Sequence, residues 1–188
     1  STGDVSLKAV CEGSSCSSPI KEVSLLDIIN LIIRGGWPAN VGYSAKNSSK
    51  TAAEYLHAVL ADDVFRIDGI KRDASKMKLL LKSLARNESS TASNRTLKND
   101  ISSIDYEDID IETTATYLNI FDRLFLTDNQ LPFSHNIRSS VRIKQMEKRH
   151  LADPSLACAL LGAGEKTLLS DLSTLGFLFE ALCERDLK

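Results

Sequence analysis

The segment ASKMKLLLKSLAR, residues 74–86, carries the strongest fold signal in the chain. Its large apolar residues recur every three or four positions and share one face of an α-helix: Met77, Leu80, Leu81 and Leu84. We predict further helices at about 94–99 and 111–123, the second of them after an acidic turn at 105–110. We expect these three helices to pack together as one helical unit.

Two short strands are predicted after this trio. Leu124–Thr127 is apolar and is followed by a turn signal, and residues 149–151 supply a second candidate. Three helices followed by strand, loop and strand is the order of a winged helix. The third helix, 111–123, would then be the recognition helix.

The rest of the chain is also predicted to be helical. Ser24 is a suitable N-cap for a helix that Gly35-Gly36 ends, and a second helix covers 48–65. Residues 1–20, rich in Ser and Gly, predict a loosely held arm.

Asp153 and Pro154 open a helix that continues to Leu161. We predict a final helix at 165–187, bent or broken at Gly176. The fold class is thus mainly α with a small β wing.

Composition excludes several classes of protein. The 188 residues are 43% hydrophobic with a formal net charge of -2, unlike a strongly basic nucleic-acid binder. There is no apolar run of membrane-spanning length and no signal-peptide pattern, so we expect a cytoplasmic protein that does not contact a membrane. The four cysteines and three histidines are too scattered to predict a zinc site.

Catalytic motifs are incomplete in this sequence. Residues 162–167 read GAGEKT, but Glu165 and Leu160 stand where a phosphate-binding loop needs glycine. We interpret the segment as a turn between helices. No nucleophile motif is present, and the acidic runs are typical of solvated faces. We therefore predict no catalytic, cofactor-binding or metal-binding residue and no enzymatic activity for this chain alone.

A basic segment is the candidate for nucleic-acid contact. Its cations are Arg138, Arg142, Lys144, Lys148 and Arg149. On a wing they would bind phosphates without reading sequence. The predicted recognition helix has one cation and follows the acidic turn, so a protein-facing winged helix is favoured and DNA binding remains the alternative.

A second candidate is the turn formed by Arg34, Gly35, Gly36, Trp37 and Pro38. Two glycines permit positive φ and Pro38 fixes the exit, which is typical of a tight turn with Trp37 against the core. The alternative is a turn that senses a neighbouring nucleotide-binding domain.

Four strings, taken together, resemble one large prokaryotic family. They are Arg34–Ala39, Tyr55–Val64, Lys148–Ala157 and Gly176–Glu180. Members of that family have an N-terminal AAA-type ATPase module followed by a C-terminal region of unknown function. The resemblance covers essentially the whole chain and implies that it is the excised C-terminal region.

The resemblance also implies a division into three parts. Residues 1–70 would be an arm and lid-like helices, 71–147 a winged helix, and 148–188 the truncated start of a restriction-endonuclease-like domain, with Glu180 in place of the early glutamate of that fold. ATP and magnesium are expected in the missing module.

The implied role is a non-catalytic regulatory module whose partners are its own ATPase module and a further protein. A DNA-binding winged helix and a nuclease remnant are the alternatives.

Overall fold

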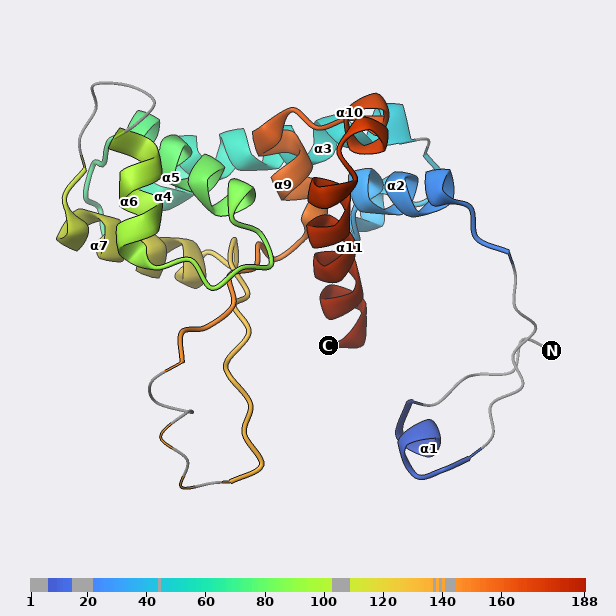
Figure 1. The fold of residues 1–188 in the computed structure, drawn as a ribbon. Coiled ribbons are helices and arrows are strands. Elements are labelled where there is room, and N and C mark those ends of the chain that lie inside the picture. The colour runs from blue at the N-terminus through green and yellow to red at the C-terminus, as the bar shows by residue number, and fades with distance from the viewer. Residues whose placement is uncertain are drawn as a thin grey trace.

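The fold is mainly helical (Figure 1). A computed structural model describes residues 7–14, 22–43, 45–102, 109–136, 138, 140 and 145–188. The α-helices of these residues are α1 (Leu7–Cys11), α2 (Leu25–Arg34), α3 (Ala45–Ala58), α4 (Val64–Arg66), α5 (Ala74–Arg86), α6 (Asn94–Ser102), α7 (Ile111–Arg123), α9 (Pro154–Leu161), α10 (Glu165–Ser170) and α11 (Leu172–Leu187). A 3-10 turn at Pro38–Asn40 and a π-helical segment at Val59–Asp63 complete the helical elements. None of the helices in this described part is long and apolar enough to cross a membrane.

Side-chain caps explain why several helices begin where the sequence predicts. Ser24 and Asp27 form a capping box at α2. Asp73 accepts hydrogen bonds from two backbone amides of α5, and Asp110 accepts one from Thr113 in α7. Each cap satisfies amides that the first helical turn leaves unpaired. The predicted starts of α2, α5 and α7 are therefore confirmed.

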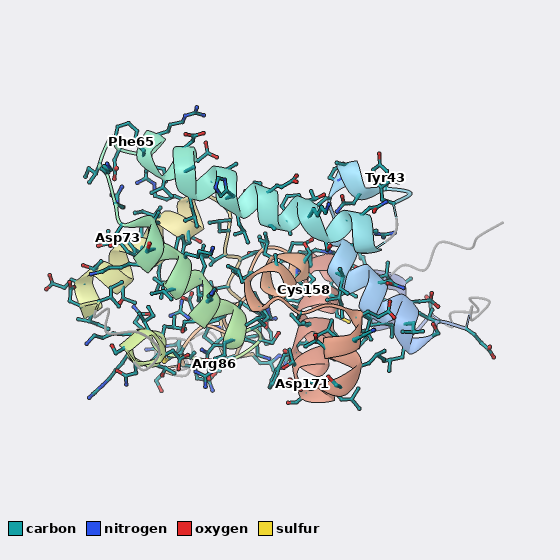
Figure 2. The ribbon with its side chains drawn as sticks, turned by 90° about the horizontal axis from the view of Figure 1, so that it is seen from above. Tyr43, Phe65, Asp73, Arg86, Cys158 and Asp171 are labelled. Atoms are coloured by element: carbon teal, nitrogen blue, oxygen red, sulfur yellow. The ribbon has the colours of Figure 1, made fainter. Side chains whose placement is uncertain are left out.

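Helix α9 lies in the middle of the molecule. It packs against α2, α3, α5 and α11. Figure 2 shows Cys158 of α9 near the centre, with α3 and α5 beside it. All of its residues except Ala159 and Leu161 are buried. A helix that is apolar on all sides must be surrounded by others, so α9 is the central helix of the core.

Helices α5, α6 and α7 pack on one another, as predicted for the trio. Three isolated antiparallel bridges follow: Ser90 with Arg149, Thr127 with Leu151, and Gln130 with Lys148. The predicted segment 149–151 thus pairs with Ser90, which precedes α6, and with Thr127, which follows α7.

The predicted strand at Leu124–Thr127 is wrong for most of its length. Leu124 and Phe125 close the end of α7, where the Leu126 amide donates to the Phe121 carbonyl at 2.8 Å. Phe125 has φ +55°, which is incompatible with a strand. Only Thr127 makes a bridge.

Two helix boundaries also differ from prediction. The segment predicted at 48–65 begins at Ala45 and passes through the π-helical turn into α4. The last helix breaks at Asp171 and not at Gly176, because the Asp171 side chain accepts from the Thr174 amide and caps α11. Gly176 lies within that helix beside open space.

The other predictions have mixed outcomes. Residues 162–164 do form a turn between α9 and α10. Most of the predicted arm and of the acidic turn lies outside the described residues. The three-part division stays a prediction, although one hydrophobic core includes residues from each part.

Candidate functional site

The Gly35-Gly36-Trp37 turn is fastened to the N-terminus of α9. The Gly36 amide donates to Oδ2 of Asp153 at 2.8 Å, and the Trp37 indole donates to Oγ of Ser155 at 2.8 Å. The Trp37 ring also packs at 4.9 Å from Tyr55 of α3. We call this set of contacts the clasp.

Gly35 is required where the clasp closes. It has φ +67° and ψ -177°, a conformation that is essentially restricted to glycine. A Cβ there would lie 2.5 Å from both Oδ1 of Asp153 and Oγ of Ser155. The Gly35 backbone can approach Asp153 and Ser155 this closely only because glycine has no side chain.

Asp153 is the centre of the clasp. Its Oδ1 accepts from the Ser155 amide at 2.9 Å and from the Ser155 hydroxyl at 2.5 Å, which caps α9. Its Oδ2 accepts from Gly36 and, at 2.7 Å, from Nη1 of Arg185 in α11. One carboxylate therefore ties the end of α2, the start of α9 and the last helix together.

The other members of the predicted turn have structural roles. Pro38 opens the 3-10 turn, and the Arg34 carbonyl accepts from the side chain of the buried Asn40 at 2.8 Å. The sequence identified this turn, but it did not identify Asp153 as its partner because the two are 117 residues apart.

The predicted basic segment does not form one cationic surface in the described residues. Arg138 is exposed, whereas Arg142 and Lys144 lie outside the described residues. Lys148 forms an ion pair with Glu180 of α11.

Arg149 is buried, with 7% of its side chain exposed. It contacts Glu147 at 2.5 Å, the Ala92 carbonyl at 3.2 Å and the Asn94 side chain at 2.8 Å. Arg149 therefore joins the 149–151 segment to α6 and is not presented to a phosphate backbone.

Glu180, the expected remnant of a nuclease motif, is half-exposed and paired with Lys148. Among the described residues, no group of three or more His, Cys, Asp or Glu side chains is arranged to hold a metal ion. The nuclease alternative stays a prediction.

Sequence reasoning missed a buried acid–imidazole pair. Glu88 and His150 are almost fully buried, and Nδ1 of His150 lies 3.0 Å from Oε1 of Glu88. The Glu88 carboxyl also accepts from the Leu151 amide at 3.1 Å. Burial raises the pKa of Glu88, and the hydrogen bonds to His150 and Leu151 oppose that rise. Through these hydrogen bonds the pair holds the turn after α5 against the 149–151 segment.

Comparison with known proteins places the chain in a family. The model of a domain of unknown function, DUF8612, matches residues 25–167, and the chain belongs to that family. The matched region includes α2, the clasp turn and Asp153, and it ends before α11 and Arg185. Neither the curated proteins nor the solved structures include a significant match.

Proposed function

We propose that this chain is a non-catalytic interaction module that serves an AAA-type ATPase, with α5, α6, α7 and the bridged segments acting as a winged helix that faces protein. The observation that carries the proposal is the charge of α7. Its exposed charged residues are Glu112, Asp122 and Arg123, and the exposed Asp110 caps it. A helix that enters a DNA groove needs cations against the phosphates, and these exposed residues have a net negative charge.

The connection after α7 supports a protein-facing role. Leu131 and Phe133 are 75% and 74% exposed there. The described part of this connection extends away from the helices (Figure 1). Apolar side chains at such a position fit contact with another protein better than contact with phosphates.

The clasp supports the regulatory part of the proposal. The resemblance assigns the Gly-Gly-Trp-Pro helices to an ATPase lid. Because Asp153 ties that turn to α9 and α11, displacement of the lid would act directly on the core of this module.

A binding assay separates the protein-facing role from the DNA alternative. We expect no saturable binding of a fluorescently labelled duplex at low salt in an anisotropy titration. Tight binding that weakens steeply with salt, and that disappears when Arg138, Arg142 and Lys144 are changed to glutamate, would overturn the proposal.

The regulatory role is tested in the complete gene product. We expect an upstream phosphate-binding loop, and no ATP–magnesium binding to this chain alone by isothermal titration. Asp153→Asn should change the ATP turnover of the complete protein several-fold. Asp171→Asn, which removes the same charge from an exposed cap of α11 outside the clasp, should not. Equal turnover in both variants would contradict a coupling between the clasp and the ATPase module.

A further inference from the structure

A groove follows helix α5 on the surface of the helical body. It consists of two connected hollows of about 700 and 290 Å³ that share Lys82, Leu160 and Leu161. Along α5 the first hollow is lined from Ala74 to Lys82 and the second from Leu79 to Arg86. The groove therefore extends over the whole of α5.

The walls of the groove are mainly Ala and Leu side chains. Ala53 and Leu56 of α3, with Leu60 and Ala61 of the π-helical segment, form one side. The end of α9 forms the floor, where Leu161 is 39% exposed. Ile101 of α6 lines the far end. Apolar side chains that line a solvent-open hollow offer a contact surface to a partner.

The rim of the groove is cationic. Lys78 and Lys82 are exposed one helical turn apart, and neither pairs with an acid in the part of the chain that the structure describes. No carboxylate is among the described residues that line the larger hollow. In the smaller hollow Asp100 is neutralised by Arg86 at 2.5 Å. The groove is thus locally positive in a chain of net charge -2.

The dimensions favour a helix as the occupant. Helix α5 has 13 residues, and at ~1.5 Å per residue the groove is about 20 Å long, enough for three to four helical turns. An amphipathic helix binds such a groove through apolar residues at positions i, i+3 or i+4, and i+7. Nucleic acid does not suit the apolar floor, and a compact small molecule would fill only part of the length.

The π-helical segment supports a functional assignment. Val59–Asp63 joins α3 to α4 without proline, and it supplies Leu60 and Ala61 to the wall. π-Helical turns in α-helices are often located at functional sites, because their irregular geometry is kept where it shapes a surface.

We propose that this groove binds an acidic amphipathic helix of a partner protein, with the apolar face of that helix on Leu160 and Leu161 and its carboxylates on Lys78 and Lys82. The proposal rests on the interaction role proposed above and names the surface and chemistry of the partner. Because α7 does not line the groove, the DNA assay and a test of the groove can fail independently.

A display selection tests the proposal with random peptides as the probe. A library of random 16-residue peptides is selected on the wild-type chain and counter-selected on Lys78→Glu/Lys82→Glu. We expect enriched peptides to combine helically spaced Leu, Ile or Phe with Asp or Glu. Enrichment of basic sequences, or of none, would overturn the proposal.

Matched variants then locate the binding of the best peptide by fluorescence anisotropy. Lys78→Glu/Lys82→Glu should weaken it at least tenfold, whereas Lys71→Glu/Lys166→Glu, an equal charge change outside the groove, should have little effect. Leu161→Ser should also weaken it, unlike Leu169→Ser, at a leucine of similar exposure on α10. Equal losses in a pair of variants would refute the location.

Discussion

Replacing Gly35 with alanine should damage the clasp more than any comparable glycine substitution. The new Cβ would lie 2.5 Å from Asp153 Oδ1, 2.5 Å from Ser155 Oγ and 2.8 Å from the Trp37 ring. These atoms are not free to move, because Asp153 and Ser155 bond each other and the start of α9. The methyl group must therefore break part of the clasp or distort the backbone.

The cost has two parts. A non-glycine residue at φ +67° and ψ -177° carries backbone strain of roughly 1–3 kcal/mol. Displacing Asp153 or Ser155 leaves buried polar groups without partners, at about 1–3 kcal/mol. The sum is about 2–6 kcal/mol. For a chain of this size, with ~2–4 °C per kcal/mol, we expect the melting temperature to fall by roughly 4–24 °C.

Thermal unfolding followed by circular dichroism measures this loss, and Gly162→Ala is the matched control. Gly162 also has positive φ, at +65°, but it lies in the left-handed helical region with open space around it. Alanine there should cost only about 1 kcal/mol, or ~2–4 °C. If the two variants melt within 2 °C of each other, the clasp does not constrain Gly35 and the reasoning is refuted.

Three other perturbations give distinct results. Burial raises the pKa of Glu88 above its ordinary 4.5, so ionisation of this carboxyl opposes folding. The stability of the wild type relative to Glu88→Gln, measured by denaturant unfolding at several pH values, should be greatest below pH 4.5 and fall as pH rises. The opposite trend would show that a charged pair with the imidazole stabilises the fold. Arg149→Met should destabilise the chain by about 1–3 kcal/mol because three contacts are lost, whereas an arginine serving only phosphate contact would leave the unfolding free energy unchanged. Burial raises the pKa of Cys158 to about 12, so maleimide labelling read by mass spectrometry should modify exposed Cys11 rapidly and Cys158 only on unfolding; fast labelling of Cys158 in the native chain would contradict its burial in α9.

Local signals explain which elements could be predicted from sequence. Helices α5 and α7 have both an apolar stripe and an Asp cap, so their bounds follow from residues a few positions apart. The break in the last helix was also encoded locally, in the Asp171 cap, but Gly176 offered a stronger-looking signal. An exposed glycine inside a helix costs only about 1 kcal/mol, which the neighbouring packing of α11 offsets.

The clasp and the buried pair could not be predicted in the same way. Gly36 and Asp153 are 117 residues apart, and Glu88 and His150 are 62 apart. In neither pair does one residue indicate the other in the sequence. Asp153, for example, is already explained as the cap of the helix that follows it. These contacts depend on the position of α9 among α2, α3, α5 and α11, which no local sequence signal indicates.

Helix α9 also connects the clasp to the groove. Its first turn is held in the clasp by Asp153, and its last residues form the floor of the groove along α5. Eight residues at ~1.5 Å each separate these ends by about 12 Å, and burial on nearly all sides makes the helix move as a rigid body. We therefore expect a change in the Gly35-Gly36 turn to shift Leu160 and Leu161. Asp153→Asn should alter the affinity of the groove for its selected peptide, although Asp153 does not line it. An unchanged affinity, in a variant that retains its fold, would show that the clasp and the groove work independently.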